Sequence, residues 1–191
     1  TPRNDGACGP AEPRSAPTAA DGSFRLDVPA AEAGRHAVRV DVPADAVDAD
    51  TGAAVGRAFV LRAPATGTSG AHAVFVSPLT TLVQALVADG ATRADAESRV
   101  RGLAGLALSP LADFTEAATG DAGRAAARVA RLVQMVGDSQ RAELAAVVGQ
   151  KDAGGTVITA TDVDAEVQAR LPGLLPAIAA TAGESAIAQS S

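Results

Sequence analysis

The spacing of the apolar residues changes once along this chain, close to residue 77. Before that point apolar and polar residues alternate, which is typical of half-buried strands. From Leu79 onward the apolar residues recur three and four positions apart, as on one face of a helix, and Ser77 with Pro78 forms a helix start signal. The change predicts an α+β protein in which a β part is followed by an all-helical bundle.

Three segments before residue 77 carry the strand pattern, and a short fourth follows them. They are residues 23–28, 38–42, 57–62 and 73–76. Three or four strands with one apolar face make a marginal sheet, so we expect a short, incomplete antiparallel β-sandwich-like part. Strands upstream of Thr1, the helical part or another chain would have to cover it. In the last case an exposed β edge would bind a protein partner or a second copy of the chain.

Five helices are predicted after the change of period. Ser77 starts the first, which Gly90 ends, and Thr92 is placed to cap the second. Thr80 and Thr81, in the first turn, are expected to bond to backbone groups and to make the junction with the β part rigid. The apolar faces of these two helices hold Leu79, Leu82, Val83, Leu86, Val87, Ala96, Val100 and Leu103.

The later helices are expected to be interrupted by glycine and proline. A helix from about Asp121 buries Val129, Leu132, Val133 and Val136 and ends at Gly137. A shorter helix then covers residues 138–148. The last helix begins at a capping box of Thr161 and Asp164, and Pro172 and Pro176 are expected to break or kink it. The predicted organisation is a linker (1–22), a β-sandwich-like part (23–76), a helical domain (77–181) and a tail (182–191).

The composition excludes several classes of function. With a net charge of −6 and a pI near 4.8, the chain lacks the basic footprint of a nucleic-acid-binding protein. No apolar run approaches the length of a membrane span. Trp and Tyr are absent and aromatics make up only 2% of the chain, which supplies few platforms for glycan binding.

No set of residues forms a catalytic signature. His36 and His72 are the two histidines, and no Gly-x-Ser-x-Gly elbow or His-Glu-x-x-His zinc motif accompanies them. We therefore expect two surface histidines and no enzyme activity. Arg124, Arg128 and Arg131 share one helix face, which either binds an anionic partner or is a solvated face paired with nearby acidic residues; the second interpretation is favoured.

Two further features involve metal binding and disulfide chemistry. Asp48 and Asp50, with Asp45 as a third oxygen ligand, have spacings used in calcium loops, but Phe59 stands where an EF-hand has its glutamate. Calcium is thus the one cofactor that these residues suggest. The plainer interpretation of them is an acidic connecting loop. Cys8, the single cysteine, is left with three alternatives: a disulfide to a cysteine outside this stretch, a bridge between two molecules, or no role.

Three segments resemble a known type of bacterial protein. They are Thr-Ala-Ala-Asp-Gly-Ser-Phe at 18–24, Val-Ser-Pro-Leu-Thr-Thr-Leu-Val at 76–83 and Gly-Ala-Thr-Arg-Ala-Asp-Ala at 90–96. Similar segments occur in large surface proteins and lipoproteins with a carboxypeptidase-regulatory, or transthyretin-like, β-sandwich followed by a V-[ST]-P-L-T-T-L-V junction and a helical region. The resemblance covers roughly residues 18 to 135 and implies an extracytoplasmic, non-catalytic context.

Together these observations predict a structural or adhesive module of a secreted or cell-surface bacterial protein, as a subunit of an extracellular assembly or filament. The alternative is an extracytoplasmic module that binds a glycan or another small ligand. The two predictions differ in what the fold must offer: an association surface in the first case, and a cavity with convergent polar groups in the second.

Overall fold

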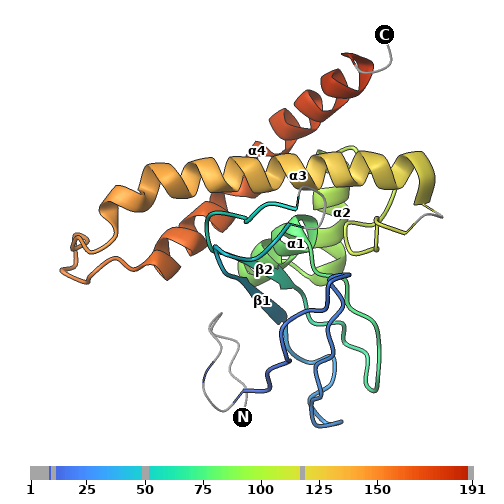
Figure 1. Cartoon of the computed structure of the whole chain (residues 1–191), viewed down its shortest axis with the longest axis horizontal. Helices are drawn as coiled ribbons and strands as arrows, with labels where there is room; N and C mark the ends of the chain where they lie inside the picture. The colour runs from blue at the N-terminus through green and yellow to red at the C-terminus, as the bar shows by residue number, and fades with distance from the viewer. Residues whose placement is uncertain (1–8, 10–11, 49–51, 117–118, 189–191) are drawn as a thin grey trace.

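The protein is mostly helical, with one small sheet (Figure 1). The computed structural model describes residues 9, 12–48, 52–116 and 119–188, with side chains as far as 183. Along the chain its elements are β1 (Val38–Val42), β2 (Phe59–Ala63), α1 (Pro78–Ala88), α2 (Arg93–Leu103), α3 (Gly120–Leu144), the 3-10 helix η2 (Ala145–Val147) and α4 (Ala160–Ala188).

The β-sandwich prediction is wrong. β1 and β2 form a two-stranded antiparallel sheet in which Val40 faces Leu61, and no third strand joins it within the described residues. Residues 23–28 and 73–76, both predicted as strands, have no strand structure. The helical part of the prediction stands, because four α-helices follow the sheet in the part of the chain that the structure describes.

The alternation that suggested a strand at residues 23–28 nevertheless reflects a real difference in burial. Phe24 and Leu26 are half-buried, whereas Ser23, Arg25 and Asp27 are exposed. The segment follows the predicted turn, in which the Gly22 amide donates to the Ala19 carbonyl at 2.9 Å. Alternation therefore marks a segment with one side inward, but a strand also needs a neighbouring backbone to bond with.

The first two helices begin as predicted, and the first ends as predicted, just before Gly90. Ser77 and Thr80 form a reciprocal capping box, and Pro78 occupies the first helical position of α1. Thr92 caps α2 by accepting a hydrogen bond from the Asp95 amide at 3.2 Å. The periodic apolar positions of both helices face the core, where Leu79, Leu82, Val83 and Val100 are fully buried.

Gly137 does not end a helix, contrary to the prediction. α3 passes through it and continues to Leu144, so the separate helix predicted at 138–148 is instead the end of α3 followed by η2. Gly137 is buried against α4, and a Cβ atom there would lie 3.6 Å from Leu171 Cδ1 and 3.1 Å from Arg141 Nη1. Gly137 thus lies inside α3, at ordinary van der Waals distance from α4, and does not terminate the helix.

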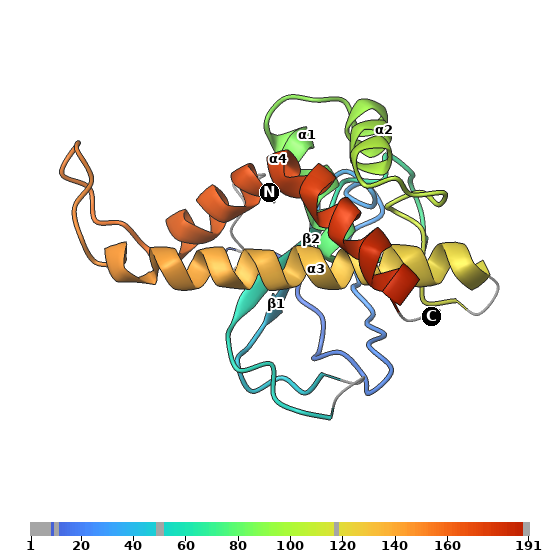
Figure 2. The same cartoon turned by 90° about the horizontal axis from the view of Figure 1, so that it is seen from above.

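α4 also passes through residues expected to interrupt it. Of the break or kink expected at Pro172 and Pro176, the break is absent, because α4 runs continuously from Ala160 to Ala188. Its two halves nevertheless point in different directions, as Figure 2 shows. A proline inside a helix costs about 3 kcal/mol. That cost is opposed by burial, because Leu171, Leu175 and Ile178 are at most 5% exposed in the core. Tertiary packing therefore holds the helix together where its local sequence does not.

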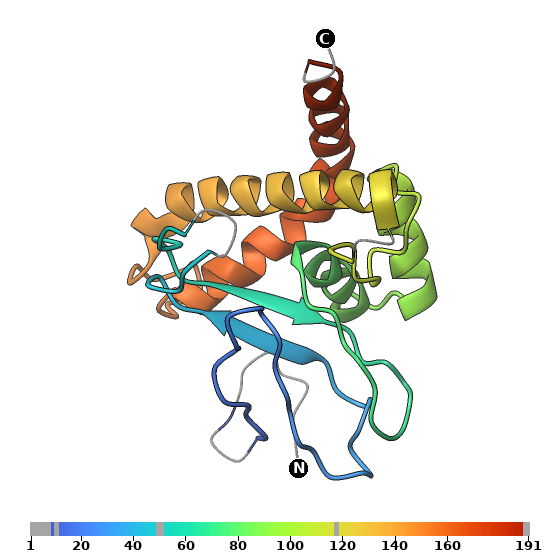
Figure 3. The ribbon, with the colours of Figure 1, turned by 45° about the vertical axis from the view of Figure 1, so that its right-hand side comes forward.

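The helices and the sheet are arranged around α1. Figure 3 shows α3 crossing above α1 and α4, the sheet on the other side of α1, and the coil of residues 12–37 beyond the sheet. Seen from above, the C-terminal half of α4 crosses α3 (Figure 2), and it extends away from the body (Figures 1 and 3). One apolar core joins the four helices; its fully or almost fully buried members include Leu79, Leu82, Val83, Val100, Val129, Val133, Val167 and Leu175.

In the part of the chain that the structure describes, none of the helices combines the length and the apolar character of a membrane span. This agrees with the prediction made from the sequence.

Candidate functional site

The strongest concentration of buried polar groups lies where β2 meets α1. The backbone N–H of Arg62 donates to Thr81 Oγ1 at 2.8 Å, and the carbonyl of Arg62 accepts from Thr80 Oγ1 at 2.7 Å. Thr80 Oγ1 also accepts from the Ser77 amide at 2.8 Å, and Thr81 Oγ1 donates to the Ser77 carbonyl at 2.9 Å. Two threonine hydroxyls thereby replace a neighbouring strand along this edge of β2.

This arrangement agrees with the expectation that Thr80 and Thr81 bond to backbone groups. Both residues are at most 5% exposed. Threonine is a poor choice inside a helix, but in the first turn its hydroxyl reaches the strand while Leu79 and Leu82 enter the core. The first turn of α1 is therefore bonded to the sheet and packed against the helices.

We expect Thr80→Val to lower the free energy of unfolding by about 2 kcal/mol, since it keeps the shape but leaves the Arg62 carbonyl and the Ser77 amide without the hydroxyl. Urea unfolding followed by circular dichroism measures the change. Thr68→Val, at an exposed position, is the control and should change it by less than about 0.5 kcal/mol. Equal stability of the two variants would contradict a role for the Thr80 hydroxyl.

The side chain of Arg62 belongs to a second group of contacts, which we call the polar junction. It joins β2, α3 and α4 and consists of Arg62, Gln134, Asp138, Arg141, Asp164 and Gln168. Its charged members are two arginines and two aspartates, so their formal charges balance. All are half-buried or buried, and Gln168 is only 5% exposed.

Asp164 is the centre of the polar junction. Its Oδ1 accepts from Arg141 Nε at 2.9 Å, and its Oδ2 accepts from Gln168 Nε2 at 2.8 Å. Arg62 Nη1 lies 4.0 Å from Oδ2 and also bonds to Gln168 Oε1. The exposed fractions of the three charged side chains are 15% for Arg62, 11% for Arg141 and 13% for Asp164, so this aspartate balances two nearly buried guanidinium groups.

Asp138 extends the polar junction toward the surface. Its Oδ1 accepts from Arg141 Nη1 at 3.0 Å, and its carboxylate also accepts from Gln134 Nε2 at 3.1 and 3.2 Å. On the sheet side, Arg57 Nη1 donates to the Asp138 carbonyl at 3.3 Å. The junction thus continues from the interior to a carboxylate that is 37% exposed.

The polar junction leaves almost no space for a ligand. The cavity against it has a volume of about 10 Å³ and is lined by Thr81, Gln134, Arg141 and Gln168 together with apolar residues. That volume corresponds to about one water molecule. The buried polar groups therefore bond to one another, and the arrangement has no room for a substrate.

A larger cavity of about 250 Å³ lies at the start of α3. Its lining includes Phe114, Thr115, Glu116 and Arg124, and the last three are exposed. Gly123 lets the preceding loop lie against α3, because a Cβ atom there would lie 2.7 Å from the Phe114 carbonyl oxygen. Small-molecule pockets usually measure about 300–1,000 Å³ and hold buried, convergent polar groups. This cavity is smaller, and of its polar lining Thr115, Glu116 and Arg124 are exposed and Thr119 is half-buried.

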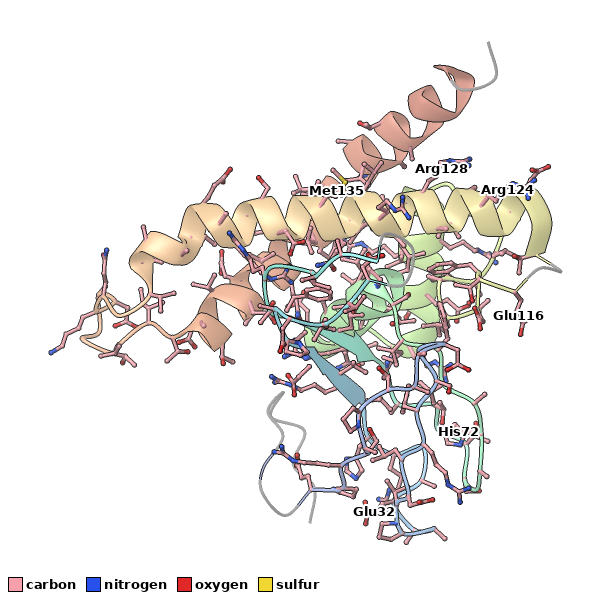
Figure 4. All side chains as sticks on the ribbon, in the orientation of Figure 1. Glu32, His72, Glu116, Arg124, Arg128 and Met135 are labelled. Atoms are coloured by element: carbon pink, nitrogen blue, oxygen red, sulfur yellow. The ribbon has the colours of Figure 1, made fainter. Side chains whose placement is uncertain are left out.

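The two histidines lie in separate loops and do not meet. His36 Nε2 is 2.6 Å from Glu32 Oε2, and this hydrogen bond lowers the pKa of the Glu32 carboxyl. His72 Nε2 is 3.0 Å from Thr66 Oγ1, while its Nδ1 donates to the Gly70 carbonyl at 2.8 Å. Figure 4 labels Glu32 and His72 in different loops on the far side of the sheet from α3.

The Thr66–His72 pair does not amount to a catalytic arrangement. A hydroxyl beside an imidazole is the beginning of a nucleophile and base, but the imidazole is then usually oriented by a buried carboxylate. Here a backbone carbonyl holds Nδ1, and the His72 side chain is exposed. The prediction of surface histidines is accurate for His72, whereas His36 is half-buried.

The predicted calcium loop is only partly described. Asp45 and Asp48 are exposed residues of a small hairpin in which Val47 pairs with Ala54, and the Asp48 amide donates to the Ala53 carbonyl at 2.9 Å. Asp50 and Cys8 lie outside the described residues, so the calcium site and the disulfide remain predictions. Among the residues described, no three His, Cys, Asp or Glu side chains are close enough to hold a metal ion.

The capping box predicted at the start of α4 is displaced by two residues. The Thr159 amide donates to Asp162 Oδ2 at 2.7 Å and the Asp162 amide donates to Thr159 Oγ1 at 3.3 Å, so these two residues form the cap. The hydrogen bond from Thr159 lowers the pKa of the Asp162 carboxyl. Asp164, assigned to the cap from its sequence position, instead occupies the centre of the polar junction.

Comparison of the chain with known protein families, with curated proteins and with solved structures found no match.

Proposed function

We propose that this chain is a non-catalytic structural module of a secreted or cell-surface bacterial protein. The observation that carries the proposal is the use of its buried polar groups. In the polar junction these groups bond to one another and so connect β2, α3 and α4. The cavity beside them has a volume of about 10 Å³, so they do not face an open pocket. A binding or catalytic site would direct such groups into a space of ligand size.

The proposed location depends on the sequence resemblance. The segment at residues 76–83 resembles the junction found in bacterial surface proteins, and here it forms the capped start of α1 that bonds to β2. The expectation of a β-sandwich ahead of this junction is withdrawn. The proposal is therefore supported by the contacts through which residues 76–83 connect α1 to β2.

Two measurements test the proposal. In the first, the chain is incubated with peptide, ester, phosphate-ester and glycoside substrates beside a His36→Gln/His72→Gln double variant. We expect no turnover that distinguishes the two proteins. Turnover that the double variant loses would overturn the non-catalytic assignment, and hits on a glycan array would favour the ligand-binding alternative.

The second measurement is sedimentation velocity over a wide range of protein concentration, combined with negative-stain microscopy. For a subunit of an extracellular assembly we expect association that increases with concentration. A chain that stays monomeric at every concentration would contradict the assembly form of the proposal.

A further inference from the structure

The outer face of α3 carries a line of three arginines and one methionine, which we call the arginine stripe. Arg124, Arg128, Arg131 and Met135 are spaced by four, three and four residues, so they lie on one face of the helix over about 16 Å. This face is opposite the one that buries Val129 and Val133. Figure 4 shows Arg124, Arg128 and Met135 in a row along α3, on the side away from the sheet.

Two members of the stripe are unlike ordinary solvated side chains. Met135 is 59% exposed and is one of five large hydrophobic residues exposed in the described part of the chain. Arg128 is half-buried, and its Nε is a buried donor for which no hydrogen-bond partner exists among the described residues. A buried unsatisfied donor is destabilising, and an incoming acceptor would remove that penalty.

The solvated-face interpretation accounts for Arg124 but not for Arg128. Arg124 forms an ion pair with Asp121 three residues earlier, and both side chains are largely exposed, at 67% and 95%. Arg128 forms no such pair within the described residues. The stripe is positively charged, although the chain as a whole has a net charge of −6. It is therefore a local positive patch on an acidic protein.

We infer that the arginine stripe binds an acidic segment of a partner protein, with carboxylates on the arginines and an apolar side chain on Met135. Carboxylates match the planar guanidinium fork and accept two hydrogen bonds from it. A long polyanion such as duplex DNA would also meet the repulsion of the remaining negative charge. Pairing of the stripe with the same stripe of a second copy would bring arginines of both copies together, and this repulsion disfavours that form of self-association.

This inference rests on the proposed structural role, since it names the partner that such a module would hold. The probe is a fluorescein-labelled helical peptide with three glutamates and one leucine spaced to match the stripe, and fluorescence anisotropy measures its affinity. We expect Arg128→Gln to weaken binding about tenfold, as loss of a charge-assisted hydrogen bond does. Met135→Ala should weaken binding by a smaller factor, and added salt should weaken it for every variant.

Arg170→Gln on α4 is the matched control, because Arg170 is 52% exposed and pairs with Glu166 at 2.7 Å. It should leave the affinity unchanged. Equal affinity of the Arg128 and Arg170 variants, no binding by the wild-type chain, or equally tight binding of duplex DNA or phosphatidylserine vesicles would each overturn the inference. If Arg128→Gln fails to fold, Arg124→Gln, at a largely exposed position, replaces it. Loss of peptide binding leaves the turnover and sedimentation results unaffected, so the two proposals fail separately.

Discussion

Asp164→Ala should lower the free energy of unfolding by about 3 kcal/mol. The substitution leaves the guanidinium groups of Arg62 and Arg141 together without the carboxylate between them, and breaking a buried ion pair from one side costs about 3–5 kcal/mol. We expect the lower end of that range because the three side chains keep 11–15% of their surface exposed. For a chain of 191 residues, such a loss lowers the melting temperature by roughly 6–12 °C.

The measurement is thermal and urea unfolding followed by circular dichroism, because the chain has no Trp or Tyr for fluorescence. Asp138→Ala is the matched control, since Asp138 also bonds to Arg141 but its side chain is 37% exposed. It should cost about 1 kcal/mol or less. Adding Arg141→Met to Asp164→Ala should recover part of the loss, because the junction then holds one arginine and one aspartate, so that its formal charges balance again.

An Asp164→Ala protein as stable as Asp138→Ala would contradict a central role for this carboxylate. The polar junction would then be a set of contacts that water replaces without cost, and the observation that carries the proposed function would be lost. A loss that Arg141→Met does not reduce would instead assign the effect to the Gln168 contact at 2.8 Å.

Local signals in the sequence were sufficient for the elements whose stability is local. β1, β2, α1 and α2 lie where alternation, caps and helical spacing placed them, because a capping box or a heptad-like face is determined by residues within one or two turns. The joining role of Thr80 and Thr81 was predictable for the same reason. The combination of Ser77, Pro78 and the two threonines is typical of a capped helix start, and few other structures would explain it.

The errors occurred where tertiary packing determined the local structure. Gly137 looked like a helix terminator but is buried within α3, and Pro172 lies within a helix that its apolar neighbours hold in the core. Residues 23–27 have the burial pattern of a strand without a partner, and the pattern ends at Val28, which is exposed. In each case the conformational preference of the residue can be read from the sequence, but the local structure depends on whether a distant segment contacts it.

The polar junction was missed because its members are far apart in the sequence. Arg62 and Gln168 are separated by 106 positions, and Arg141 and Asp164 by 23. A weak signal was present: Gln134, Asp138 and Arg141 are spaced by four and three residues, as are Asp164 and Gln168 by four, which places polar side chains on one face of each helix. Such a face on a helix predicted to be buried indicates a polar contact with another element.

Leu82→Ala should have an effect as large as Asp164→Ala, by a different mechanism. Leu82 is fully buried at the centre of α1, the helix that contacts β2, α2, α3 and α4. Removing a buried leucine side chain loses its transfer free energy and leaves a cavity, which costs about 3–4 kcal/mol in a site that cannot collapse. The site is rigid because the first turn of α1 is bonded to β2 through Thr80 and Thr81.

The expected loss separates apolar packing from hydrogen bonding at the same helix. Leu82→Met, which nearly conserves volume, should cost less than about 1.5 kcal/mol, and Met135→Ala, at a position 59% exposed, less than about 0.5 kcal/mol. If Leu82→Ala and Thr80→Val are combined, their effects should exceed or fall short of the sum, because the two residues share one turn. Strict additivity of the two would mean that the bonds to β2 and the packing of Leu82 stabilise α1 independently, and the rigid connection between sheet and helices would be contradicted.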